Sequence, residues 1–194
     1  SSAASDVYKR QMLETILAAK LGDDGRTDSR GRGEDATVNR LEDLSAEITG
    51  KEAAVFMPTG TFANSTAIMT CCHAGDKVLV EEEQHILLTE KFVFEKDYGR
   101  LIPVCYRLDH KHMPDPEEID RLLSESGSKL VCLENSHNSA GGYCIDCSTL
   151  EKIRKVADKH GAWIHMDGAR LFHAAAYLDT TASQLCQYAD SVMF

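Results

Sequence analysis

The stretch "AWIHMDGARLF", residues 162–172, decides how the fold of this chain is interpreted. It begins as a short apolar strand that ends abruptly on a carboxylate, Asp167, and Arg170 follows soon after. Two explanations are open from these residues alone. The two side chains either pair at a corner between a strand and a helix, or each binds one part of a small molecule.

The rest of the chain alternates between short apolar strands and amphipathic helices. Strands are predicted within residues 52–58, 76–82, 101–108, 129–135, 162–167 and 190–194. Helices are predicted within residues 36–49, 59–73, 85–94, 115–126 and 148–161, with Asp115 and Ser148 as N-terminal caps of the last two. This alternation predicts an α/β fold, in which helices cover both faces of a mostly parallel sheet.

Composition excludes several classes of function. The chain has 194 residues and a formal net charge of -10, which argues against a nucleic-acid or anionic-membrane partner. No apolar run approaches the roughly 20 residues of a membrane span. Its seven cysteines are scattered, and the one CxxC pair, Cys144 and Cys147, lacks the further ligands of a zinc site. We therefore expect no metal and a reducing compartment, the cytoplasm.

Ligands of open α/β sheets bind beyond the carboxyl ends of the strands, so the residues just after each strand are site candidates. Thr59, Gly60 and Thr61 join a predicted strand to a predicted helix. A phosphate group could be bound there by the two hydroxyl groups and by the free N–H groups at the start of a helix, and the glycine would let it approach the backbone. Threonine and glycine at such a position are also ordinary helix caps, so this signal is weak by itself.

Three further candidates follow other strands. His85 is either a solvated or capping histidine or a flat ring against a flat cofactor, and His137 lies in a turn where histidine is more often structural. Asp167 could keep a protonated ring nitrogen charged, and Arg170 could bind a substrate carboxylate in bidentate fashion. Together the candidates match the phosphate, ring and ring nitrogen of pyridoxal 5'-phosphate and the carboxylate of an amino acid.

Four longer motifs carry a family resemblance: "GEDATVNRLE", "GKEAAVFMPTGTFANSTAIM", "CLENSHNSAGG" and "HMDGARLFHAA". From Leu13 to Phe194 the chain resembles the low-specificity threonine aldolases, in the β-eliminating lyase branch of the pyridoxal-phosphate enzymes. The resemblance implies the fold type I large domain of the aspartate aminotransferases. It also implies homodimers or homotetramers with shared active sites.

The resemblance also implies residue roles. Thr59, Gly60 and Thr61 match the residues that hold the cofactor phosphate, and His85 matches the ring-stacking histidine. Asp167 matches the partner of the pyridine nitrogen, and Arg170 matches the arginine that binds the substrate carboxylate.

The implied reaction cleaves L-threonine, allo-threonine or a related β-hydroxy-α-amino acid to glycine and an aldehyde. His85, His137 or a water is the candidate base. Two alternatives remain open, which are another pyridoxal-phosphate lyase that acts on an amino acid and a catalytically dead homologue.

The two ends of the chain carry separate expectations. Residues 1–11 lack apolar periodicity and are expected to be a non-native or disordered leader, followed by a partial cofactor-binding domain over residues 12–194. The family's lysine that forms the Schiff base with the cofactor is expected beyond Phe194. We therefore expect the chain by itself to be truncated and inactive.

Overall fold

The computed structural model describes residues 9–23, 25–29 and 31–194. The chain is divided into two compact units. The first unit is Ser1–Glu47 with Glu52–Phe56, and the second is Ile48–Lys51 with Met57–Phe194. All of the candidate site residues belong to the second unit.

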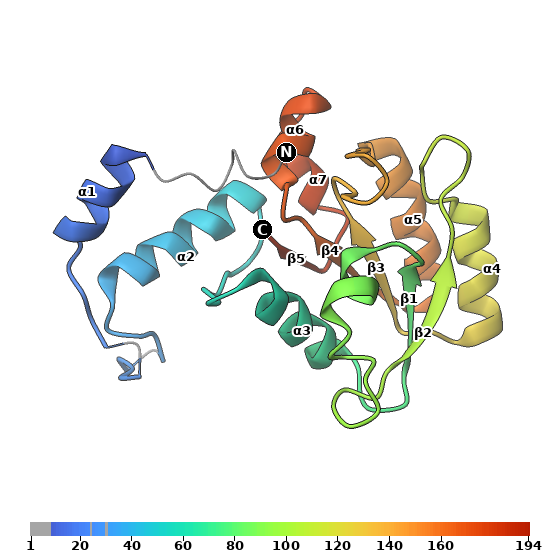
Figure 1. Cartoon of the computed structure of the whole chain (residues 1–194), viewed down its shortest axis with the longest axis horizontal. Helices are drawn as coiled ribbons and strands as arrows, with labels where there is room; N and C mark the ends of the chain where they lie inside the picture. Colours follow the sequence, from blue (N-terminus) through green and yellow to red (C-terminus); the bar gives the residue numbers. More distant parts are fainter. Residues whose placement is uncertain (1–8, 24, 30) are drawn as a thin grey trace. The chain divides into compact units, whose positions relative to one another are not determined.

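A five-stranded parallel sheet forms the centre of the second unit (Figure 1). Its strands are β1 (Lys77–Glu81), β2 (Ile102–Tyr106), β3 (Leu130–Glu134), β4 (Trp163–Asp167) and β5 (Ser191–Met193), in the order β2-β1-β3-β4-β5. Glu134 is in register with Asp167, and Asp167 with Met193. The last residues of three neighbouring strands therefore meet at one edge of the sheet.

Helices cover both faces of this sheet, as the apolar strands predict. They are α3 (Gly60–Cys71), the π-helical turn η2 (Ile86–Glu90), α4 (Pro116–Ser126), α5 (Cys147–His160), α6 (Leu171–Tyr177) and α7 (Ala182–Cys186). Alternate strand residues enter two separate cores, because successive side chains point to opposite faces. Val131 and Leu133 pack with the core of α4 to α7, whereas Leu130 and Cys132 pack with that of α3 and η2. The predicted fold class is confirmed.

Most of the predicted elements form, but one predicted strand does not. Residues 52–58 make no strand among the described residues, and Val55 and Phe56 are exposed. The apolar run predicts a strand, but a strand also requires a partner for its backbone, which periodicity does not reveal. Helices α1 (Arg10–Ala18), α6 and α7 are not predicted, and α6 and α7 are too short for a clear helical period. Of the helix predicted within residues 85–94, only the π-helical turn η2 forms.

The start of α5 is also predicted wrongly, by two residues. The helix begins at Cys147, and its N-cap is Asp146, whose Oδ1 accepts a hydrogen bond of 2.7 Å from the Thr149 backbone N–H. Ser148 lies inside the first turn. Aspartate and serine are comparably good caps, so the sequence offers two starts.

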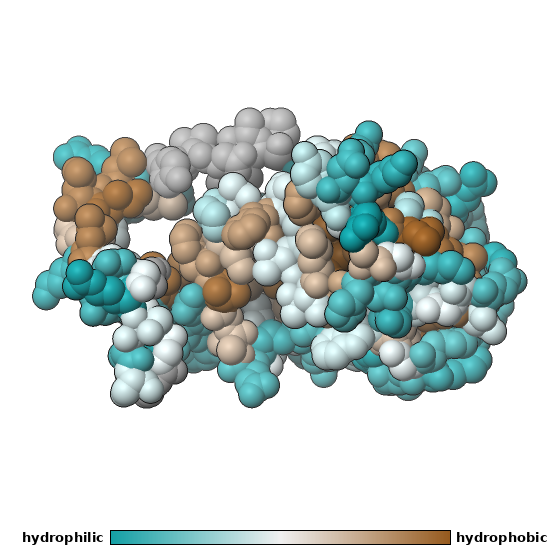
Figure 2. Space-filling model, turned by 90° about the horizontal axis from the view of Figure 1, so that it is seen from below, coloured by the Kyte–Doolittle hydropathy of each residue, from teal (hydrophilic) through white to brown (hydrophobic). Residues whose placement is uncertain are grey.

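In the first unit, α1 (Arg10–Ala18) buries none of its side chains, and its apolar residues appear as brown atoms at the left end of Figure 2. The second helix, α2 (Ala36–Thr49), is followed by Gly50, which has a positive φ of 68°. Of the leader expected over residues 1–11, residues 1–8 lie outside the described part of the chain, and Arg10 begins α1. No helix among the described residues is long and apolar enough to cross a membrane.

Candidate active site

A cavity of about 430 Å³ opens at the edge where β3, β4 and β5 end. We call it the edge cavity. It is lined by Gly60, Thr61, His85, Glu90, Glu134, Asn138, Asp167, Ala169, Arg170, Met193 and Phe194. Five of the candidate residues, from three separate segments of the chain, are therefore brought together. Thr59 and His137 are not among its lining residues.

The start of α3 forms one wall of the edge cavity. Thr59 is its N-cap, and its hydroxyl oxygen accepts a hydrogen bond of 3.1 Å from the Phe62 backbone N–H. Gly60 and Thr61 line the edge cavity, whereas Thr59 lines a neighbouring cavity of about 540 Å³, which Thr61 also lines. The first N–H groups of a helix have no partner within the helix. This wall therefore suits a phosphate group.

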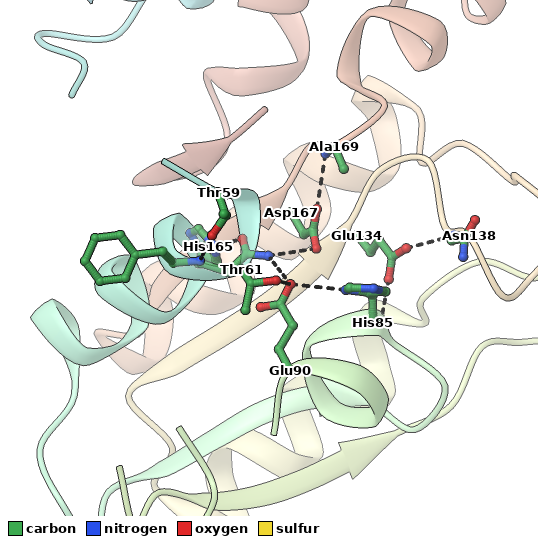
Figure 3. A network of polar contacts seen from close by, with 11 residues as sticks. Thr59, Thr61, His85, Glu90, Glu134, Asn138, His165, Asp167 and Ala169 are labelled. Carbon is green, nitrogen blue, oxygen red and sulfur yellow. Dashed lines mark hydrogen bonds and ion pairs between the residues drawn. The ribbon is translucent and has the colours of Figure 1, made fainter. Parts of the chain in front are cut away.

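Asp167 lines the edge cavity and is 3% exposed, and Figure 3 shows its hydrogen-bond partners. Its Oδ1 accepts from the Ala169 backbone N–H at 3.1 Å, and its Oδ2 accepts from Asn64 Nδ2 at 3.0 Å. Burial raises the pKa of Asp167 to about 6, and the negative charges of Glu134 and Glu90 add to this rise. Among the described residues both hydrogen-bond donors are neutral, so a cationic ring nitrogen would supply the missing charge.

Gly168 determines where the chain goes after Asp167. A β-carbon at Gly168 would lie 2.7 Å from the Met193 carbonyl oxygen, closer than such contacts allow. The chain then reaches Arg170, which precedes α6 and lines the edge cavity. Among the described residues, Asp167 and Arg170 form no ion pair with each other. The two side chains therefore do not pair with each other at this corner.

His85 lies on the other side of the edge cavity, just before η2, and its side chain is 39% exposed. Its Nδ1 is 3.1 Å from Glu90 Oε1, and its backbone N–H donates to Glu134 Oε2 at 2.9 Å (Figure 3). The other carboxylate oxygen of Glu134 accepts from the Asn138 backbone N–H at 2.8 Å. One buried carboxylate therefore connects the His85 loop to the Asn138 loop.

His137 is buried away from the lining of the edge cavity. Its Nε2 is 2.8 Å from Glu81 Oε2, and its Nδ1 accepts from the Ala140 backbone N–H at 3.2 Å. Burial by itself lowers the pKa of His137, but the hydrogen bond to Glu81 and the charge of Glu134 raise it overall. Both ring nitrogens are thus occupied by structural partners, which favours His85 over His137 as the candidate base.

One group of side chains meets the spacing of a metal site. Atoms of His85, Glu90 and Asp167 lie within 4.8 Å of one another. However, the Asn64 side-chain N–H₂ group donates to both carboxylates, at 3.1 Å to Glu90 and 3.0 Å to Asp167. The Asn64 amide thus accounts for the short distance between the Glu90 and Asp167 carboxylates without an ion between them.

Sequence reasoning missed Asn64, Glu90 and Glu134. Glu134 ends β3 in the position that Asp167 has on β4, so the strand-end signal was present for it, whereas Glu90 lies in η2 and Asn64 lies inside α3. A buried polar residue within an otherwise apolar helix face is the one signal that could have identified Asn64.

Comparison with known proteins gives a consistent result. The family model described as beta-eliminating lyase matches residues 4–194. Low-specificity L-threonine aldolase 1 of Arabidopsis thaliana is 33% identical over 189 residues, which cover 93% of this chain and 51% of that protein. Low specificity L-threonine aldolase of Escherichia coli K12 is 32% identical, covering 94% and 53%. The chain thus spans about half the length of these relatives.

Solved structures show the same fold. A putative L-allo-threonine aldolase from Listeria monocytogenes superposes with a TM-score of 0.75 at 24% identity, over 96% of this chain and 51% of that one. The threonine aldolase of Leishmania major has a TM-score of 0.76 at 20% identity, over 95% and 54%. Aspartate aminotransferase from Thermus thermophilus has a TM-score of 0.59 and covers 80% of this chain.

Proposed function

The chain belongs to the beta-eliminating lyase family, and on this basis we propose that it binds pyridoxal 5'-phosphate in the edge cavity. We propose further that the protein cleaves a β-hydroxy-α-amino acid, such as L-threonine or L-allo-threonine, to glycine and an aldehyde. The buried, negatively charged Asp167 opposite the start of α3 is the observation that supports this most strongly. It offers a cation partner and a phosphate site in one cavity.

Each residue of the edge cavity has a proposed task. Gly60 and Thr61 bind the phosphate through the start of α3, with Thr59 shaping that start as the N-cap. Asp167 keeps a proton on the ring nitrogen, and Arg170 orients the substrate carboxylate. When bound, the cofactor supplies an electron sink for the cleaved bond.

His85 is the proposed base as well as the residue stacked on the ring. Because Glu90 accepts from His85 Nδ1, the neutral ring carries its proton on Nδ1 and leaves Nε2 unprotonated. Nε2 is then the atom that takes the proton of the substrate β-hydroxyl group, directly or through a water. His137 stays the alternative, with its ring engaged by Glu81.

Two measurements test this proposal in sequence. The first is binding of pyridoxal 5'-phosphate to the chain, followed by its absorbance. The second is formation of glycine and acetaldehyde from L-threonine and L-allo-threonine, in the 194-residue chain and in any longer natural protein that contains it. Pyruvate formation from serine and racemisation of alanine are assayed in parallel. Cofactor binding with only one of these other reactions would replace the aldolase proposal.

Site variants assign the roles. In a longer natural protein that contains this chain together with the Schiff-base lysine, we expect Asp167→Ala to lower turnover by orders of magnitude and cofactor affinity by less, because the electron sink needs the ring proton. Arg170→Ala should chiefly raise KM and also lower turnover. Lys152→Ala, on the exposed side of α5, is the control. Unchanged kinetics in both site variants would show that the site is elsewhere.

Assembly and location complete the proposal. We propose a homodimer or homotetramer with shared active sites, supported by family membership, and a cytoplasmic location, supported by the scattered cysteines. Light scattering of the purified protein and imaging of the tagged protein in cells test the two statements separately.

A further inference from the structure

Asn64 is a polar residue in an unfavourable place. It lies inside α3 and is fully buried. Asparagine is a poor residue for the interior of a helix, and a buried amide destabilises the folded state unless its hydrogen bonds are formed. An explanation for Asn64 must therefore come from its partners.

The side chain of Asn64 has three partners, all of them buried. Its Nδ2 donates to Asp167 Oδ2 at 3.0 Å and to Glu90 Oε1 at 3.1 Å. Its Oδ1 lies 3.0 Å from His165 Nε2. On the far side of that ring, His165 Nδ1 lies 2.8 Å from Ser191 Oγ. The chain of contacts thus runs from β5 through β4 and α3 to the edge cavity.

With His165 neutral and both carboxylates ionised, one arrangement of hydrogens satisfies this chain of contacts. Ionised carboxylates accept hydrogen bonds and cannot donate them, so the Asn64 N–H₂ group must face Asp167 and Glu90. Its oxygen must then face His165, which therefore carries its proton on Nε2. His165 Nδ1 is left as an acceptor for the Ser191 hydroxyl group. The orientation of the Asn64 amide is thus fixed from both sides.

We propose that Asn64 is a positioning residue, which holds Asp167 as a hydrogen-bond acceptor toward the cofactor ring nitrogen in an orientation fixed by His165 and Ser191. This inference rests on the proposed function, because the ring nitrogen belongs to pyridoxal 5'-phosphate. It assigns a task to a residue of α3 that touches neither the proposed phosphate nor the substrate.

The charges around Asp167 explain why such a residue is needed. Asp167 is buried near two other carboxylates, Glu90 and Glu134, and both disfavour its ionised form. The Asn64 N–H group and the Ala169 N–H group oppose this effect by donating to the carboxylate. Without Asn64, one oxygen of Asp167 loses its donor, and the carboxyl group gains a proton more readily. A protonated carboxyl group no longer stabilises a charged ring nitrogen.

The first test uses the unaltered chain. Nitrogen-15 NMR of the histidine rings distinguishes a proton on Nδ1 from a proton on Nε2. We expect His165 to carry its proton on Nε2 at pH 7. A proton on Nδ1 would reverse the Asn64 amide, remove the donor from Asp167 and overturn the inference.

The second test compares two variants that each add a carboxylate to α3. Asn64→Asp removes both donors with almost no change of shape, and Thr66→Asp is the matched control, since Thr66 also lies on α3 but lines the neighbouring cavity. Carbon-13 NMR follows the titration of Asp167. We expect its midpoint to rise by about one pH unit in Asn64→Asp, a tenfold gain in proton affinity, and to stay in place in the control.

The cofactor provides a separate readout in the same variants. With pyridoxal 5'-phosphate labelled at the ring nitrogen, we expect a protonated nitrogen in the unaltered chain and in Thr66→Asp. In Asn64→Asp we expect loss of that proton at pH 7 and about tenfold weaker binding. The same Asp167 midpoint and the same ring protonation in all three proteins would overturn the inference while leaving the proposed function intact.

A different result would contradict the proposed function itself. In that case the unaltered chain does not bind pyridoxal 5'-phosphate, although His165 and Asp167 still titrate as described. The proposed role toward the cofactor is then lost together with the function. If Asn64→Asp does not fold, as judged from its amide spectrum, the histidine measurement on the unaltered chain decides by itself.

Discussion

His165, only 1% exposed, lies on β4 between Asn64 and Ser191. Burial lowers the pKa of His165 from 6.5 to about 4. The folded state therefore binds this proton less readily than the unfolded state does. The resulting contribution to stability is complete above pH 6.5 and is lost as the pH falls toward 4.

We predict a pH effect that depends on His165. Between pH 7 and pH 5 the unaltered chain should lose about 2 kcal/mol more unfolding free energy than His165→Gln, since glutamine keeps a donor toward Asn64 and does not titrate. Urea unfolding at the two pH values measures this difference. His173→Gln, at an exposed position of α6, is the control. Equal losses in the unaltered chain and His165→Gln would contradict the prediction.

Glu134 gives a second prediction for a single residue. Both of its carboxylate oxygens accept backbone N–H groups, one from His85 and one from Asn138. Glutamine has a single acceptor oxygen, so Glu134→Gln must leave one of these groups without a partner. We expect a loss of about 1–3 kcal/mol in unfolding free energy and weaker binding of pyridoxal 5'-phosphate.

Thermal unfolding and cofactor titration check this prediction, with Glu83→Gln as the exposed control. If Glu134→Gln behaves like Glu83→Gln in both measurements, Glu134 does not position the two loops.

The sequence reveals the candidate residues of the edge cavity unequally. Asp167 ends a strand, and Arg170 and His85 follow strands within a few residues. The topology of a parallel sheet brings such positions together. Asn64 is different, since its contact with Asp167 spans 103 positions of the chain. A polar residue in an apolar helix face marks Asn64 as unusual, but only the folded structure identifies Asp167 as its partner.

At the scale of elements, α5 offers a direct choice between two caps. Asp146 accepts from the Thr149 N–H group, whereas Ser148 lies inside the first turn. We predict that Asp146→Ala lowers the unfolding free energy by about 1 kcal/mol and that Ser148→Ala has a much smaller effect. Chemical denaturation of the two variants measures both. If Ser148→Ala lowers the unfolding free energy more than Asp146→Ala does, Ser148 is the N-cap, as predicted from the sequence.

The sequence predicts a helix or strand correctly where its apolar pattern matches the burial of that element in the folded protein. The strands at residues 76–82 and 129–135 are apolar and buried, and the helix at residues 115–126 has both a cap and a clear apolar face. Residues 52–58 are equally apolar, yet they pair with no strand among the described residues. Strand pairing depends on a neighbouring strand elsewhere in the chain, and the hydrophobicity of a segment does not show whether such a strand exists.

At the scale of the whole molecule, cofactor binding should change global stability. A ligand that binds only the folded state at one hundred times its Kd adds about 2.7 kcal/mol. For a chain of this size we predict that pyridoxal 5'-phosphate raises Tm by about 5–10 °C. Differential scanning calorimetry measures the shift.

Pyridoxal without its phosphate is the control for this measurement, and we expect it to shift Tm far less, since the start of α3 would have no anion to bind. Equal shifts for the two compounds would contradict the assignment of Gly60 and Thr61.

The sheet is parallel, so every strand of the second unit starts at one edge and finishes at the other. All of the proposed chemistry lies where strands finish, whereas the turns at Gly127 and Gly161 lie where β3 and β4 start. These two turns are therefore natural places for engineering. A fluorescent reporter or an affinity tag inserted there would be attached at the edge opposite the cavity, and the protein could be labelled without blocking its substrate.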